Sequence, residues 1–204
     1  MMGMTNVDHF TRASHAFIDV VAQIGPEQWG QPGLGSWDVR SLVGHTTRAI
    51  LTVENYLARD EPDQAAITTA EMYYTTIYEL TDPQAVAERG VEAGIALGDD
   101  PVTFIRAADI RARALIEAQH RGRLVSIGGL GIPLDEYLRT RVFELVAHTL
   151  DVARATGATA SIPEAPVACA VTLAAGVAAA TGHGEEVLLA LTGRQPLPEG
   201  FSVV

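Results

Sequence analysis

The chain has 204 residues, of which 48% are hydrophobic and 19% charged, so disorder is not expected and a sizeable core can form. Its formal net charge of −11 argues against a nucleic-acid partner and against binding to an anionic membrane surface. A single cysteine excludes an internal disulfide and any metal site built from several cysteines.

The N-terminal quarter of the chain predicts two helices joined by a loop. Its first ten residues, MMGMTNVDHF, lack the basic and apolar regions of a signal peptide, so we expect a cytoplasmic protein. Residues 7–24 then repeat apolar side chains at steps of three and four, which is typical of an amphipathic helix. A loop rich in glycine and proline follows at 25–36. Ser36 is the predicted N-cap of a second helix that ends near Arg59.

The middle of the chain predicts three further helices and one interruption. A short helix is expected at 69–80, and Asp-Pro pairs begin two more, at 83–97 and at 101–119. Residues 121–135 break the helical pattern, because alternating apolar side chains are followed by three glycines. A loop or a short hairpin fits this segment better than a helix.

The C-terminal part begins with an apolar helix predicted from about Leu134 to Thr156. Two more helices follow in PEAPVACAVTLAAGVAAATG and GEEVLLALTG, and an extended tail ends the sequence. Cys169 lies in the first of these two and is predicted to be a buried structural thiol. Its apolar run is too short and too rich in alanine to span a bilayer, so no membrane partner is expected.

No repeat, charge run or linker divides the sequence. We therefore predict a single all-α domain over residues 1–204. Its core is expected to be a four-helix bundle over about 5–157, with additional C-terminal helices and the tail over about 158–204.

The helix predicted at 134–156 carries polar side chains along one side. They recur at steps of four, three, four and three, which forms a single stripe, and they are Tyr137, Arg141, Glu144, His148 and Asp151. Either this stripe is the only solvent-exposed side of an apolar helix, or its polar side chains form a functional site inside the core. Glu144 and His148 lie one turn apart and can bind one metal ion, although a lone pair at this spacing is also typical of a helix surface.

The second helix supplies a candidate third ligand. Its own polar stripe consists of Ser41, His45, Arg48, Thr52 and Asn55. If the two helices pack side by side, His45, Glu144 and His148 converge. Two imidazoles and one carboxylate suit a divalent metal such as zinc and leave a fourth position open, as a catalytic site requires. The remaining histidines show no such convergence, and they are His9, His15, His120 and His183.

Two segments carry a resemblance to a known family. GSWDVRSLVGHTTR (35–48) and LRTRVFELVAHTLDVARATG (138–157) resemble the DinB-like superfamily, and more narrowly the mycothiol-dependent maleylpyruvate isomerase family. The resemblance extends over 73–101, over 131–141 and over the ending LLALTGRQPLPEGFSVV, so it covers nearly the whole chain. It implies a DinB-like bundle in which His45, Glu144 and His148 bind the metal, with zinc as the expected ion.

The resemblance also implies an activity. Mycothiol is the expected thiol cosubstrate, and a metal-bound thiol loses its proton and becomes a nucleophile for a small electrophile. The expected enzyme is a cis–trans isomerase like maleylpyruvate isomerase, or a mycothiol S-transferase. Arg48 and Arg141 are expected to bind a carboxylate of the substrate or the cofactor, with surface salt bridges as the alternative. Asp151 is expected to orient His148 or to pair elsewhere on the helix.

Two other functions use the same three ligands. One is a non-catalytic metal-binding module, and the other is a metal-dependent hydrolase in which an activated water is the nucleophile. A thiol-binding groove beside the metal would favour the thiol-dependent enzyme, and a closed site with four ligands would favour the binding module. For each of them we expect a monomer or a homodimer.

Overall fold

The computed structural model describes residues 5–80 and 82–204, and the regular secondary structure of this part is helical apart from one small hairpin. The elements in chain order are α1 (Asn6–Val21), α2 (Val39–Leu57), α3 (Ala70–Leu80), α4 (Pro83–Ala96), α5 (Pro101–Glu117), β1 (Leu124–Ile127), β2 (Leu130–Pro133), α6 (Leu134–Thr156), α7 (Glu164–Ala180) and α8 (Gly184–Leu191). The all-α prediction is confirmed. Of the two alternatives for 121–135, the hairpin is the one that forms, with Gly128 and Gly129 at positive φ in its turn.

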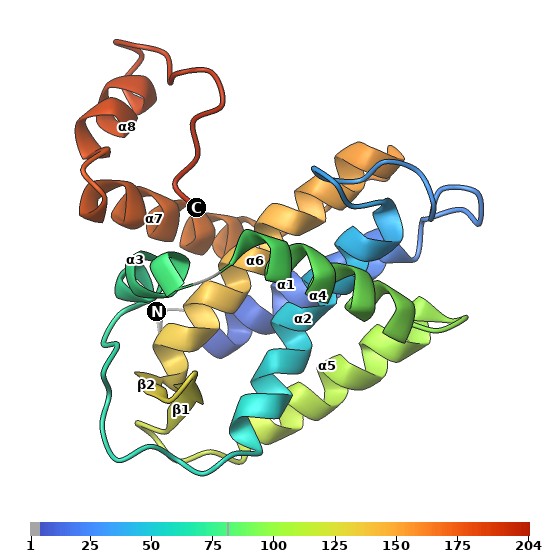
Figure 1. The fold of residues 1–204 in the computed structure, drawn as a ribbon, viewed down its shortest axis with the longest axis horizontal. Coiled ribbons are helices and arrows are strands. Elements are labelled where there is room, and N and C mark those ends of the chain that lie inside the picture. Colours follow the sequence, from blue (N-terminus) through green and yellow to red (C-terminus); the bar gives the residue numbers. More distant parts are fainter. Residues whose placement is uncertain (1–4, 81) are drawn as a thin grey trace.

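Helices α1, α2, α5 and α6 form a four-helix bundle in which α1 and α2 each contact both α5 and α6 (Figure 1). The apolar positions that recur at helical spacing are the ones that face the core. Phe10 and Phe17 of α1, Leu42 and Ile50 of α2, and Leu145 of α6 are all fully buried. Burial of these faces against one another accounts for the bundle.

The second helix begins later than its sequence suggested. Asp38, not Ser36, is the N-cap, and its side chain accepts a hydrogen bond from the Ser41 backbone N–H at 2.8 Å. The residues before it form a turn in which the Gly33 N–H donates to the carbonyl of Trp37 at 2.8 Å. Because this turn occupies Trp37, the helical conformation can start only after it.

Helix α4 lies directly on α2 because glycines occupy the crossing point. A Cβ atom on Gly44 of α2 would lie 2.1 Å from the backbone nitrogen of Gly94 of α4. A Cβ atom on Gly90 would lie 2.6 Å from the ring of Trp37. Only residues without a side chain allow two helix backbones to approach this closely. The contact places α4 beside the turn of α2 that carries His45.

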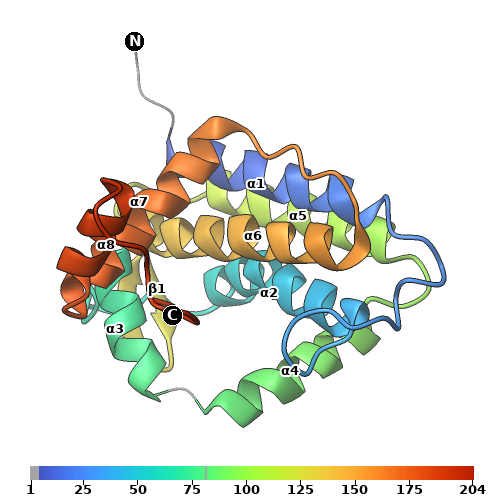
Figure 2. The same cartoon turned by 90° about the horizontal axis from the view of Figure 1, so that it is seen from above.

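The C-terminal helices extend from one side of the bundle, where α7 packs on α6, α1 and α3, and α8 packs on α7 (Figures 1 and 2). A second, smaller apolar cluster joins α3 to α7 through Ala70, Tyr74, Leu173 and Val177. Cys169 of α7 is only partly buried, which corrects the prediction of a buried thiol. Within the described ranges, none of the helices is long and apolar enough to cross a membrane.

Candidate metal centre

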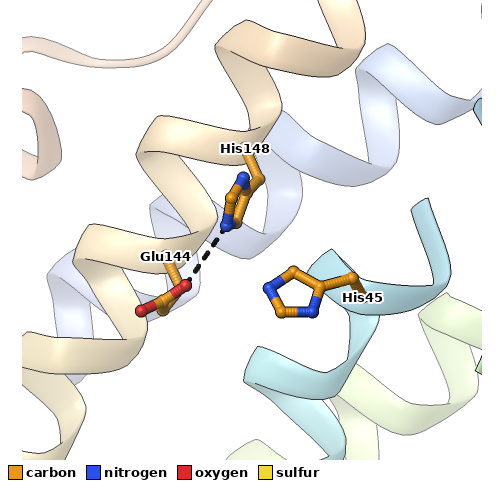
Figure 3. Close-up of side chains that lie close together, drawn as sticks. All are labelled: His45, Glu144 and His148. Carbon is orange, nitrogen blue, oxygen red and sulfur yellow. Dashed lines mark ion pairs between the residues drawn. The ribbon is translucent and has the colours of Figure 1, made fainter. Parts of the chain in front are cut away.

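The side chains of His45 on α2 and of Glu144 and His148 on α6 meet in the bundle (Figure 3). The sequence predicted this convergence on the condition that the two helices pack side by side. Potential ligand atoms of His45, Glu144 and His148 all lie within 4.8 Å of one another. His148 Nε2 is 3.3 Å from Glu144 Oε2, and the rings of His45 and His148 are nearly perpendicular with centroids 4.9 Å apart. Two donors of a tetrahedral zinc ion are about 3.4 Å apart. The donor set therefore fits one divalent ion with little movement.

The polar stripe of α6 faces inward. Tyr137 and Arg141 are buried, whereas the side chains of Glu144 and His148 are 21% and 17% exposed to solvent. Leu150, on another side of the same helix, is exposed. The polar side chains of the stripe therefore lie inside the fold, and Glu144 and His148 remain accessible to solvent.

His148 is oriented by a carboxylate on its far side. Its Nδ1 lies 3.1 Å from Asp151 Oδ2, so Nε2 is the nitrogen that faces Glu144. Asp151 also lies 3.7 Å from the guanidinium of Arg154. A carboxylate behind the imidazole is the usual arrangement around metal-binding histidines, because it sets the tautomer and ring direction. Of the two roles expected for Asp151, orienting His148 or pairing elsewhere on the helix, the contact with His148 agrees with the first.

Two aromatic residues that the sequence did not single out contact the other ligands. Tyr74 of α3 donates its hydroxyl hydrogen to Glu144 Oε1 at 2.8 Å. The ring of Trp37 stacks against His45 with centroids 4.4 Å apart, and its Nε1–H donates to the carbonyl of Ala87 at 2.9 Å. Neither residue shares a helix with the ligand it contacts, so no spacing in the sequence indicated these roles.

The two imidazoles differ in charge. Burial, together with the nearby His148, lowers the pKa of His45 to about 4, so His45 is neutral at physiological pH. Burial also works against a charge on His148, but its hydrogen bonds to Asp151 and Glu144 raise its pKa to about 9. Burial opposes a charge on Glu144 too, yet His148 and Arg141 lower the pKa of that carboxyl to about 2. Without a metal, the centre therefore holds one neutral imidazole and one imidazolium–carboxylate pair.

His45 offers a free nitrogen to this pair. Figure 3 shows its Nε2 turned toward Glu144 and His148, while its Nδ1 is buried without a hydrogen-bond partner. A neutral imidazole with an uncommitted nitrogen directed at a carboxylate and a second imidazole is the chemistry of a metal ligand.

The two arginines next to the ligands form no salt bridge with the described side chains. The guanidinium of Arg141 lies over the rings of Tyr137 and Tyr73 and donates to Thr140 Oγ1 and the Tyr73 hydroxyl, at 3.0 and 3.2 Å. Arg48 is half-buried, and burial together with the neighbouring Arg89 lowers its pKa. Among the side chains that the structure describes (5–77 and 82–204), no carboxylate lies within ion-pair distance of Arg48 or Arg141. The surface salt bridges that were their alternative role do not form.

The remaining histidines lie elsewhere. His15, His120 and His183 pair with acidic side chains, at 3.4, 2.9 and 3.0 Å from Asp109, Glu61 and Glu186. His9 lines a surface hollow of about 330 Å³ together with Arg139 and Cys169. None of them belongs to a group of potential metal ligands in the described part of the chain.

Comparison with known proteins identifies a family. Residues 10–153 match the family described as the mycothiol maleylpyruvate isomerase N-terminal domain. The matched region runs from α1 into the last turn of α6 and includes all three converging ligands, whereas α7 and α8 lie beyond it. No curated protein and no solved structure matched the chain.

Proposed function

We propose that this chain, which belongs to the mycothiol maleylpyruvate isomerase N-terminal domain family, is a metal-dependent enzyme that directs a thiol at a small electrophile. The observation that supports this most is the convergence of His45, Glu144 and His148 at a place that solvent reaches. Three protein donors leave a position free for a ligand, whereas a structural zinc site is closed by four. Zinc is the expected metal and mycothiol the expected thiol. The reaction is a cis–trans isomerisation or an S-transfer.

When bound, a divalent cation here would lower the pKa of a thiol so that the nucleophilic thiolate exists at neutral pH. The residues of the chain prepare the centre for it in different ways. His45 is already neutral and presents a free nitrogen. His148, which lies 3.3 Å from Glu144, would have to release its proton to solvent in order to bind, and Asp151 at its Nδ1 would keep Nε2 directed at the centre.

Arg48 and Arg141 are proposed to bind a carboxylate of the electrophile or an anionic group of the thiol. Arg141 lies over two tyrosine rings and forms no salt bridge with the described side chains, although the charge of Glu144 acts on it electrostatically. Arg48 lies one turn from His45 and likewise forms no salt bridge with the described side chains. A planar guanidinium with free N–H groups is suited to a carboxylate, with which it can form two parallel hydrogen bonds.

Zinc binding is expected to release about one proton per chain at neutral pH, because His148 has its pKa raised to about 9 and must become neutral to bind. The apparent affinity should therefore rise about tenfold per pH unit up to about 9 and level off beyond it. Calorimetric titration with zinc in buffers of different ionisation enthalpy measures the proton count. Affinity that is independent of pH over this range would contradict the assignment of His148.

The direct test of the function is thiol consumption by metal-loaded protein. With zinc present, we expect the protein to accelerate the loss of mycothiol in the presence of chlorodinitrobenzene, or the mycothiol-dependent isomerisation of maleylpyruvate. Chelated protein and reactions without thiol are the controls. Hydrolysis of an ester without thiol would favour the hydrolase. Zinc binding with neither activity would favour the non-catalytic module.

A further inference from the structure

We propose that Tyr74 is a positioning residue that holds Glu144 in its metal-binding orientation, and that α7 holds Tyr74 in place. The inference rests on the proposed function, since it assigns a role toward the same metal centre. It goes beyond the three ligands, because it connects them to a part of the chain that follows the region matched to the family.

The first step concerns the two oxygens of the Glu144 carboxylate, which contact different partners. Its Oε1 accepts the Tyr74 hydroxyl hydrogen at 2.8 Å, and its Oε2 lies 3.3 Å from His148 Nε2. The Tyr74 hydroxyl is also 3.3 Å from the carbonyl of Thr140, but the shorter contact to a charged acceptor is the stronger one. Because Oε1 accepts this hydrogen bond, Oε2 is the oxygen that remains for a cation. It lies next to His148 Nε2, which would bind the same cation.

The second step is the rigidity of the tyrosine ring. Tyr74 is 7% exposed and lies edge-on to Tyr73 and to Phe143, with ring centroids 5.2 and 5.3 Å away. Leu173 and Val177 of α7 belong to the same buried cluster. A ring enclosed in this way cannot swing, so its hydroxyl fixes the carboxylate rather than following it.

The third step separates positioning from ordinary core stability. A buried tyrosine hydroxyl that only satisfies its own hydrogen bond contributes to stability and leaves metal affinity unchanged. A hydroxyl that orients a ligand affects metal affinity, because loss of such outer partners typically weakens binding about 10- to 100-fold. The two roles therefore predict different outcomes for the removal of a single oxygen atom.

The test compares Tyr74→Phe with Tyr137→Phe. Tyr137 is a suitable control because it is also buried and donates its hydroxyl hydrogen to Thr52 Oγ1 at 2.7 Å rather than to a metal ligand, while phenylalanine keeps the ring that contacts Arg141. We expect Tyr74→Phe to weaken zinc binding about 10- to 100-fold and to alter the visible spectrum of bound Co²⁺. Tyr137→Phe should lower the melting temperature of the metal-free protein similarly and keep wild-type zinc affinity. Equal zinc affinity in the two variants would overturn the proposal.

The contribution of α7 is tested by Leu173→Ala, which opens space in the apolar cluster that contains Tyr74 and changes none of the three ligands. Zinc affinity should fall, by less than in Tyr74→Phe, and wild-type affinity would overturn the part assigned to α7. If wild-type protein binds no zinc, the proposed function fails, and crystal structures of metal-free wild type and Tyr74→Phe decide on Tyr74. A Glu144 carboxylate that turns away in the variant supports its positioning role, and an unmoved one overturns it.

Discussion

Replacing His148 with alanine is expected to abolish zinc binding and thiol-dependent activity while the metal-free protein stays folded. Two remaining ligands from different helices hold a zinc ion poorly, so the loss should exceed the roughly 100-fold upper range for an outer partner. Isothermal titration with zinc and the thiol-consumption assay measure the two effects. Zinc affinity within tenfold of wild type would contradict the assignment of His148 as a ligand.

The stability of this variant distinguishes a catalytic from a structural metal. In the metal-free protein, His148 lies between the carboxylates of Glu144 and Asp151, so its removal should lower the free energy of unfolding by about 1–2 kcal/mol. A raised pKa means that this stabilisation is full below the unfolded value of about 6.5 and disappears as the pH rises through about 9. Urea unfolding of chelated wild type and variant across that range checks the prediction. Chelated wild type that is already unfolded would indicate a structural metal instead.

Replacing Gly44 with alanine is expected to lower the free energy of unfolding by about 2–3 kcal/mol, although alanine favours a helix by about 1 kcal/mol over glycine. The added Cβ atom would lie 2.1 Å from the backbone nitrogen of Gly94, so α4 must move away from α2. Because Trp37 donates to the carbonyl of Ala87 on α4, the displacement should also change the tryptophan fluorescence.

Gly30→Ala is the matched control for this substitution. A Cβ atom there would have no neighbour within 4 Å, and the residue does not adopt a positive φ. Its free energy of unfolding should stay within about 0.5 kcal/mol of wild type. Urea unfolding followed by circular dichroism compares the two variants. If Gly44→Ala were as stable as Gly30→Ala, the close contact between α2 and α4 would not exist in solution.

Features that depend on one helix could be predicted from the sequence. The bounds of α6 agree with the predicted 134–156, because apolar periodicity and the glycine after the helix both act locally. The same periodicity placed Glu144, His148 and Asp151 on one stripe, and the contacts among them follow from helical geometry alone. Asp38 was missed as the N-cap of α2 because a turn closed by Gly33 and Trp37, rather than capping preference, decides where that helix begins.

By itself, the sequence determined that Glu144 and His148 can share one ion, since a fixed rise and twist relate residues four apart on any helix. Only the tertiary structure decided that His45 meets them, because the meeting depends on how α2 packs against α6. The packing also decided the charges, since burial keeps His45 neutral while two carboxylates keep His148 charged. Tyr74 and Trp37 became part of the site for the same reason: α3 is fixed by its contacts with α7 and α6, and the glycine crossing brings α4 against Trp37 beside His45. Such contacts join residues distant in the chain, and no local spacing encodes them.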